Sequence, residues 1–188
     1  MSSSRSHSRV NRDASSAVSK KVCVIGDFAV GKTSLVRRHV LNEFSPHYQA
    51  TLGVNIYKFS DSIDLPDGES VLLNEIIWDI ESGDPASGKL STYLQGAAGA
   101  VIVGDIAREN PLPSMIERAR LFQEVCPGRP VVFAFNKVDL ISNADDGEDG
   151  HALEEEFSAV AMRTSAAEGT AVQDLFLHLG RRILEIGA

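Results

Sequence analysis

A short apolar segment, a glycine-bounded loop and a helical pattern follow one another over residues 22–41. The loop, residues 26–33, reads Gly-Asp-Phe-Ala-Val-Gly-Lys-Thr and fits the pattern G-x-x-x-x-G-K-[ST]. Glycines at both ends let the backbone turn tightly, so successive N–H groups form an anion cradle at the positive end of the following helix. Lys32 supplies an ammonium for the β- and γ-phosphates of a nucleotide, and the Thr33 hydroxyl is placed for Mg²⁺. The segment therefore predicts a nucleoside-phosphate site on a strand–loop–helix unit.

Length and composition indicate one acidic domain. With 188 residues the chain can bury a core without disulfides, and its net charge of −8 argues against a nucleic-acid-binding surface. The two cysteines, Cys23 and Cys126, lie far apart in the sequence, which indicates buried thiols in a reducing compartment. The sequence contains neither a run long enough to span a membrane nor a secretory signal, so we expect a cytoplasmic protein.

The N-terminal segment differs from the rest of the chain. Residues 1–19 are rich in serine and arginine and lack an apolar period, which predicts a disordered tail ahead of a folded domain over residues 20–188. The alternative is that Arg5, Arg9 and Arg12 contact an anionic surface. Position 2 is not glycine, so the N-myristoylation pattern is absent.

Apolar spacing along the domain predicts alternating strands and helices. Strands are expected at 22–25, 54–60, 71–78, 100–105, 130–135 and 160–163, and helices at 32–41, 90–95, 112–125, 152–157 and 171–186. An irregular loop is expected at 43–51, a hairpin turn at 61–69, a mobile loop at 79–88 and an acidic loop at 143–150. The second and third strands are the expected antiparallel pair, in a sheet otherwise parallel and covered by helices on both faces. Because ligands bind beyond the carboxyl ends of such strands, the loops after the first, third and fifth strands should share one site.

Two of the loops carry a second signal. Asn136-Lys137-Val138-Asp139 follows a buried strand, and an aspartate there can accept two hydrogen bonds from the N1–H and the exocyclic amine of guanine. Adenine lacks this pair of donors, so it would leave a buried carboxylate unpaired. Thr164-Ser165-Ala166 follows the last strand, where backbone N–H groups can meet the guanine O6. Each motif alone has a non-functional explanation: the phosphate-loop pattern could be a chance match, and Asn-Lys-x-Asp could be a solvated turn. Their order along the chain nevertheless favours a guanine-nucleotide site.

With these motifs the chain resembles a small GTPase of the Ras superfamily, closest to the Rab branch, over residues 20–187. The resemblance implies an α/β fold, the G domain of phosphate-loop (P-loop) NTPases. This domain has a mostly parallel six-stranded sheet, one antiparallel edge strand, and helices on both faces. It also implies that the protein binds GTP and GDP with Mg²⁺, hydrolyses GTP, and acts as a molecular switch.

The resemblance assigns roles to individual residues. Thr51, in a segment similar to the first switch loop of Rab proteins, would close over Mg²⁺ and the γ-phosphate, and Asp79 would hold Mg²⁺ through a water. Phe44 stands where the family packs an aromatic edge against the guanine. The implied metal ligands are Thr33, Thr51 and Asp79, and the implied catalytic positions are Lys32, Thr51 and Gly83. The implied nucleotide-binding residues are Gly26, Phe28, Ala29, Val30, Gly31, Lys32, Thr33, Ser34, Phe44, Thr51, Asn136, Lys137, Asp139, Ser165 and Ala166.

The sequence departs from the Rab pattern in the second switch. Rab proteins continue after Trp-Asp with Thr-Ala-Gly-Gln-Glu, whereas Asp79 is followed here by Ile-Glu-Ser-Gly-Asp. Ser82 then replaces the glycine whose amide meets the γ-phosphate, and Gly83 replaces the glutamine that orients the attacking water. Because phosphoryl transfer depends on positioning and electrostatics, we expect slow intrinsic hydrolysis.

Two further departures concern partners. Phe28 stands where relatives carry a small residue, and its bulk could obstruct an arginine finger from an activating protein. In the alternative reading Phe28 points outward, and a side chain from a partner, Glu81 or Asp84 positions the water. Ile56 stands where Rab proteins usually have a phenylalanine that contacts effectors, so a typical effector surface is in doubt.

No cysteine follows Cys126, whereas Rab proteins end in a tail with prenylated cysteines. Two explanations stay open: such a tail is missing from this chain, or the protein works without a prenyl anchor. Association with the periphery of a membrane is expected only in the first case.

Three functions are compatible with the sequence. The first is a slow GTPase switch, read by effectors and served by an exchange factor and a GTPase-activating protein. The second is a GTP-binding module with negligible hydrolysis that acts as a scaffold or assembly subunit. The third, an adenosine-nucleotide kinase that shares only the phosphate loop, is disfavoured by Asp139. Effectors, pathway and oligomeric state are not encoded in any motif found here.

Overall fold

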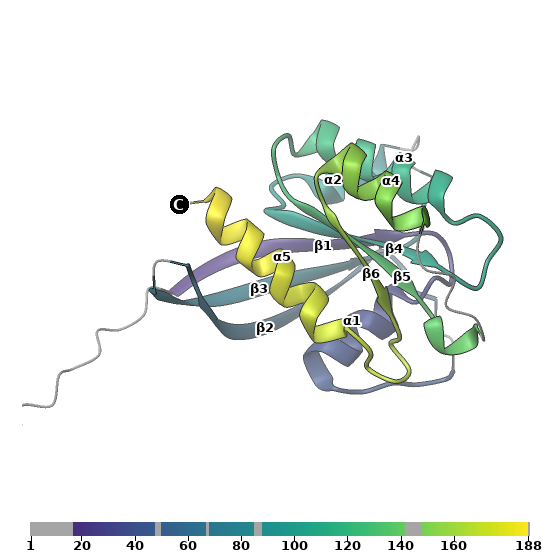
Figure 1. Cartoon of the computed structure of the whole chain (residues 1–188), viewed down its shortest axis with the longest axis horizontal. Coiled ribbons are helices and arrows are strands. Elements are labelled where there is room, and N and C mark those ends of the chain that lie inside the picture. Colours follow the sequence, from purple (N-terminus) through teal and green to yellow (C-terminus); the bar gives the residue numbers. More distant parts are fainter. Residues whose placement is uncertain (1–16, 48–49, 67, 85–87, 142–147, 188) are drawn as a thin grey trace, which may run out of the picture.

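The computed structural model describes residues 17–47, 50–66, 68–84, 88–141 and 148–187. Strands and helices alternate along this chain (Figure 1). The strands are β1 (Ala17–Gly26), β2 (Val54–Asp64), β3 (Ser70–Ile80), β4 (Gly99–Asp105), β5 (Val131–Asn136) and β6 (Val160–Thr164). The helices are α1 (Lys32–Leu41), α2 (Lys89–Leu94), α3 (Leu112–Val125), the short 3₁₀ helix η2 (Val138–Leu140), α4 (Glu148–Phe157) and α5 (Val172–Ile186).

The strands form one six-stranded sheet in the order β2-β3-β1-β4-β5-β6. β2 pairs antiparallel with β3, and the other neighbouring strands are parallel. Every residue of β4 and β5 is buried, as expected for parallel strands covered on both faces, whose sequences are continuous apolar runs. The predicted α/β fold, with one antiparallel edge strand and helices on both faces, is confirmed.

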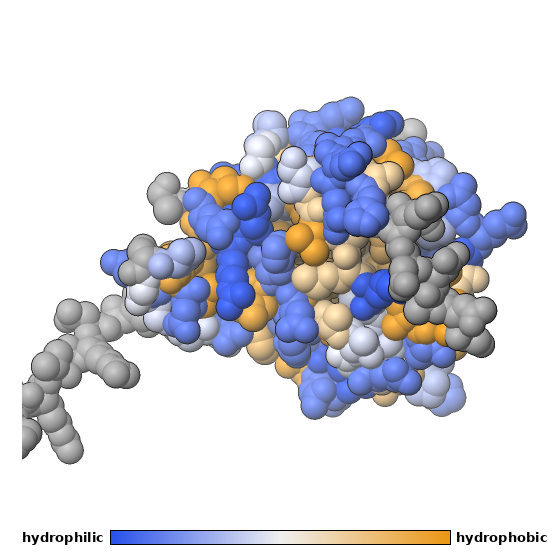
Figure 2. All heavy atoms as spheres, viewed as in Figure 1, coloured by the Kyte–Doolittle hydropathy of each residue, from blue (hydrophilic) through white to orange (hydrophobic). Residues whose placement is uncertain are grey.

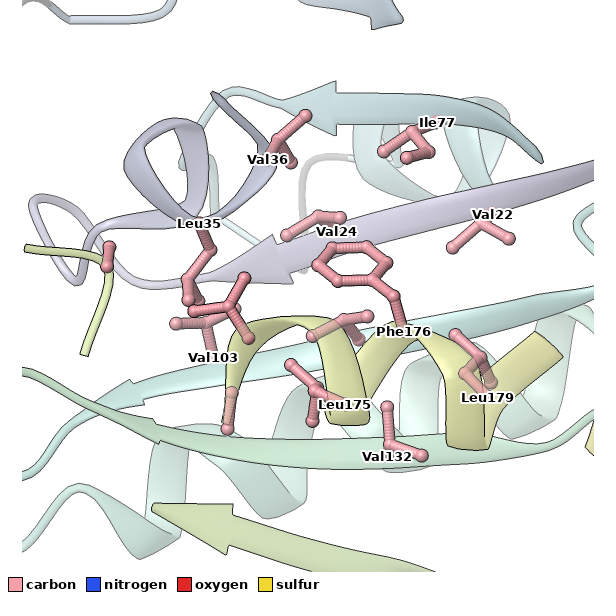
Figure 3. Close-up of a cluster of buried hydrophobic side chains, with 14 of the residues drawn as sticks. Val22, Val24, Leu35, Val36, Ile77, Val103, Val132, Leu175, Phe176 and Leu179 are labelled. Carbon is pink, nitrogen blue, oxygen red and sulfur yellow. The ribbon is translucent and has the colours of Figure 1, made fainter. Parts of the chain in front are cut away.

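The core divides into two layers because successive side chains of a strand point to opposite faces of the sheet. Val22 and Val24 of β1 pack with α1 and α5, whereas Cys23 and Ile25 pack with α2, α3 and α4. Figure 3 shows Leu175, Phe176 and Leu179 of α5 directed at strand valines, Val22, Val24, Val103 and Val132 among them. Both layers therefore fix the strand ends from which the site loops leave.

β1 is longer than its apolar stretch suggests. It begins at Ala17, inside the segment 1–19 predicted to be a tail, because β3 provides a parallel partner from Leu72 onward. Residues 1–16 lie outside the described part of the chain. The pairing that extends β1 involves residues more than fifty positions away, so no local pattern could indicate it.

Other boundaries also differ from the expected ones. The β2–β3 hairpin continues to the pair formed by Asp64 and Ser70, so residues 61–64 of the predicted turn at 61–69 are strand. β3 extends to Ile80, and α4 begins at Glu148, within the predicted acidic loop. Of that loop, residues 143–147 lie outside the described residues, as do 48–49 and 85–87 of the two predicted switch loops.

Hydrophilic residues cover most of the face shown in Figure 2, with hydrophobic residues in separate patches. Several large exposed hydrophobic residues belong to the phosphate loop, the loop before β2 and β2 itself: Phe28, Phe44, Leu52 and Ile56. Among the described residues, none of the helices combines the length and the hydropathy that a membrane span requires.

Candidate functional site

The phosphate loop joins the end of β1 to the start of α1, and both of its glycines are required. Gly31 has φ of +98°, and a Cβ there would lie 2.3 Å from Asn136 Nδ2. A Cβ at Gly26 would lie 2.3 Å from the backbone oxygen of Val103 in β4. Ala29 also has a positive φ, 60°. The loop thus turns tightly against β4 and β5. The N-terminus of α1 faces the loop, which is the arrangement that suits an anion.

Lys32, the first residue of α1, lies beneath this loop and is only 6% exposed. Its Nζ donates hydrogen bonds to the backbone oxygens of Gly26 (3.0 Å) and Asp27 (2.9 Å) and to Ser82 Oγ (2.5 Å). Burial lowers the pKa of Lys32 to about 8, although the neighbouring Asp79 carboxylate acts in the opposite direction. The amine is therefore largely protonated at neutral pH.

Three oxygen-bearing side chains from different elements converge beside Lys32. Thr33 Oγ1 lies 2.8 Å from Thr51 Oγ1 and donates to Asp79 Oδ2 at 2.6 Å, while Thr51 Oγ1 donates to the same carboxylate oxygen at 3.3 Å. Asp79 is fully buried at the end of β3, and burial raises its pKa above the usual value. Its Oδ1 has no hydrogen-bond partner among the described residues. Hydroxyl and carboxylate oxygens around an unsatisfied buried acceptor are a donor set that suits Mg²⁺.

The two segments predicted to recognise the base lie against each other and against the phosphate loop. Asn136 Nδ2 donates to the Val30 backbone oxygen at 2.9 Å, and its Oδ1 accepts from the Ala166 N–H at 3.2 Å. Ser165 Oγ donates to Asp139 Oδ1 at 2.5 Å. The amide of Asn136 thus joins the loops after β1, β5 and β6, and the Asp139 carboxylate stands at their junction.

Two arginines that were not among the predicted site residues stabilise the phosphate loop. Arg118 of α3 is 5% exposed and pairs with the Asp27 carboxylate at 2.7 Å. Arg108 Nη2 donates to the Phe28 backbone oxygen at 2.6 Å. A signal for Arg118 does exist in the sequence, because a charged residue stands between the core residues Met115, Ala119 and Phe122 on the apolar side of the helix.

Asp105 anchors Arg108, the second of these arginines, and also Lys137. It is buried at the end of β4, and its carboxylate pairs with Lys137 Nζ at 2.7 Å and with Arg108 at 3.4 Å. Lys137 has φ of +71°, and the 3₁₀ helix η2 follows it directly. The predicted Asn-Lys-x-Asp segment is therefore a short turn anchored by ion pairing rather than an open loop.

The second predicted switch contains a contact that sequence reasoning missed. Glu81 Oε2 accepts a hydrogen bond from the Gly53 N–H at 2.7 Å, and Oε1 pairs with Lys89 at the start of α2. The Glu81 backbone N–H also donates to the Gly53 oxygen at 2.9 Å. The hydrogen bonds from Lys89 and, to a smaller extent, from Gly53 lower the pKa of Glu81, and this carboxylate joins the two predicted switch loops.

Other predicted site residues lie at the margin. Phe28 is 59% exposed, in line with the alternative in which it points outward, and Phe44 is 42% exposed. At Gly83 a Cβ would find no atom of the described residues within 4 Å, so packing does not require glycine there. A cavity of about 430 Å³, lined partly by Lys20, Lys21 and Cys126, lies near the beginning of β1, away from all these residues.

Fold and site together define a nucleotide-binding α/β protein of the phosphate-loop class. The sequence profile of the Ras family matches residues 21–185. Ras-related protein RABA5e of Arabidopsis thaliana is 35% identical over 160 residues, which cover 83% of this chain and 70% of the relative. Ras-related protein Rab-22A of Homo sapiens is 30% identical over 165 residues, 87% of this chain and 82% of the relative. The chain therefore belongs to the Ras family and is a Rab-like small GTPase.

Proposed function

We propose that this Rab-like GTPase is a Mg²⁺-dependent switch with slow GTP hydrolysis. The observation that carries the proposal is the convergence of two residues on the Thr33 hydroxyl: Thr51, in the loop before β2, and Asp79, at the end of β3 just before the second predicted switch loop. A ligand that binds between these groups would order both loops at once, which is how a nucleotide controls a switch. GTP binding as such follows from membership of the family.

In the proposed mechanism, Lys32 neutralises the phosphate oxygens, and the loop N–H groups hold them in place. Thr33 and Thr51 would ligate Mg²⁺ directly, and Asp79 would orient a water bound to it. When bound, Mg²⁺ would supply positive charge that neutralises the phosphate oxygens. Asp139 would pair with the guanine, with the Ser165 hydroxyl holding its carboxylate in position.

We propose that GTP hydrolysis is slow because of Gly83. This residue has no side chain to orient a water, and the Glu81 carboxylate is already engaged with Gly53 and Lys89. Partners would supply what is missing, and they would read the loops through exposed apolar residues such as Leu52 and Ile56. We propose that the protein acts in the cytoplasm or at the periphery of a membrane, where effectors would meet these surfaces.

Single-turnover hydrolysis of bound GTP tests the rate proposal. We expect slow phosphate release from the wild-type protein and a several-fold faster release from Gly83→Gln, because the longer side chain has room to reach the water. Gly83→Ala is the matched control, since it adds a Cβ without a hydrogen-bonding group and should leave the rate unchanged. Equal rates in all three proteins would show that this position does not limit turnover.

The departures at Ser82 and Gly83 favour a second candidate, a GTP-binding scaffold with negligible hydrolysis. The same assay separates the two functions. Bound GTP that persists in the wild-type protein and in Gly83→Gln alike would favour the scaffold, whereas measurable release in either would favour the switch.

A further inference from the structure

All three N–H donors of the Lys32 ammonium already have acceptors within the chain. An ammonium carries three donors. They are directed at the backbone oxygens of Gly26 and Asp27 and at Ser82 Oγ. A phosphate oxygen that binds Lys32 must therefore displace one of these three acceptors or share a donor with it.

Ser82 is the acceptor that can yield. Gly26 is the last residue of β1, and the Asp27 side chain is held by the buried Arg118, so both carbonyls belong to the braced phosphate loop. Ser82 instead lies in an irregular segment after β3, and its contact with Lys32 uses a rotatable hydroxyl. Displacing this hydroxyl requires only a side-chain rotation or a small shift of the loop.

The neighbouring residue keeps Ser82 close to Lys32. Glu81 is joined to Gly53 by two hydrogen bonds, one through its backbone and one through its carboxylate, and it also pairs with Lys89. A tethered hydroxyl has a high effective concentration at its target, so it can compete with a ligand that must bind from solution. At this position the Rab pattern has glycine, which has no hydroxyl with which to compete.

We propose that Ser82 is a specificity-determining residue whose hydroxyl competes with the γ-phosphate for Lys32 and so shifts the site toward the diphosphate. This inference rests on the proposed function. It identifies a residue that sets the relative affinity of the same site for the diphosphate and the triphosphate. Ser82 stands where the Rab pattern has the glycine that meets the γ-phosphate, so a triphosphate would have to break the Lys32–Ser82 contact. A diphosphate has no group at that place, and its β-phosphate would share one of the other two Lys32 donors.

Equilibrium binding of GDP and of a non-hydrolysable GTP analogue, both with Mg²⁺, tests the proposal on the full chain. Ser82→Ala removes the competing hydroxyl, so we expect triphosphate affinity to rise about tenfold, the scale of one hydrogen bond to a charged group, with GDP affinity unchanged within about twofold. Ser82→Gly, which restores the residue of the Rab pattern, should give the same ratio. Ser60→Ala is the matched control, because it removes a serine hydroxyl hydrogen-bonded to Asn74 on the β2–β3 hairpin.

Three results would overturn the inference. An unchanged ratio of triphosphate to diphosphate affinity would show that the contact has no weight in binding. An equal gain for both nucleotides would place the competition at another phosphate. A weaker triphosphate complex would show that the hydroxyl donates to the phosphate rather than competing with it. By contrast, a wild-type protein that binds neither nucleotide would refute the proposed function itself.

Discussion

At the scale of single residues, the site depends on a few side chains that join loops far apart in the sequence. Asn136 is the clearest case, because its amide contacts Val30 in one loop and Ala166 in another. The motifs predicted that such residues matter, since each occurs in a recognisable pattern. They did not predict that Glu81 contacts Gly53 or that Arg118 contacts Asp27, because these partners lie 28 and 91 positions away and are brought near only by the fold.

Gly31 gives a direct test at this scale. Gly31→Ala should destabilise the protein and abolish nucleotide loading, because the added Cβ would displace the Asn136 amide in addition to straining a positive φ. Gly128→Ala is the matched control: it also has a positive φ, 72°, but no atom of the described chain lies within 4 Å of the added Cβ. We expect the control to lose only about 1 kcal/mol of stability.

Urea unfolding and binding of a fluorescent nucleotide would measure both effects for this glycine pair. If Gly31→Ala lost no more stability than Gly128→Ala and still bound the nucleotide, the close packing of the phosphate loop on Asn136 would be needed neither for stability nor for nucleotide binding.

At the scale of elements, the alternation of apolar runs predicted the sheet and its covering helices, because a covered parallel strand must be apolar on both faces. Element ends were less predictable. The start of β1 at Ala17 and the extension of the β2–β3 hairpin depend on strand pairing rather than on local composition. The turn η2 could not be read from Asn-Lys-x-Asp, because the Lys137–Asp105 ion pair that anchors it links β4 to the loop after β5.

A buried polar cluster joins α1, β3 and α5. His39 is 4% exposed; its ring stacks on Phe176 at 4.0 Å, Nε2 lies 3.0 Å from Glu75 Oε2, and Nδ1 lies 2.7 Å from Gln173 Oε1. Gln173 Nε2 donates to the His39 backbone oxygen, which fixes the amide orientation. The cluster therefore holds the helix that follows the phosphate loop against the sheet.

Removing one partner from this cluster should be costly. Glu75→Ala should lower the free energy of unfolding by about 3 kcal/mol, because it leaves the buried His39 ring nitrogen without its partner. Glu185→Ala, which removes an exposed pair with Arg182 on α5, should change it by less than about 0.5 kcal/mol. Urea denaturation measures both, and similar small losses in the two variants would mean that the cluster does not couple these elements.

At the scale of the whole molecule, both sequence signals meet at the carboxyl edge of one sheet. Topology predicts this meeting, since parallel strands carry their following loops to the same edge. Membership of the Ras family accounts for the guanine nucleotide. What distinguishes this chain is the segment Glu81-Ser82-Gly83, in which Glu81 joins the two loops through Gly53 and Ser82 contacts Lys32, where we propose that it competes with the γ-phosphate.

The central claim is that a single site binds guanine through Asp139 and the phosphates through Lys32. Competition between GDP, ADP and xanthosine diphosphate (XDP) for the protein in the presence of Mg²⁺ tests this claim most directly. The wild-type protein should prefer GDP to ADP by at least about a thousandfold, and Asp139→Asn should bind GDP more weakly and prefer XDP, because an amide donates where the carboxylate accepts. Equal affinities for the three nucleotides in the wild-type protein, or an unchanged preference in Asp139→Asn, would contradict the account.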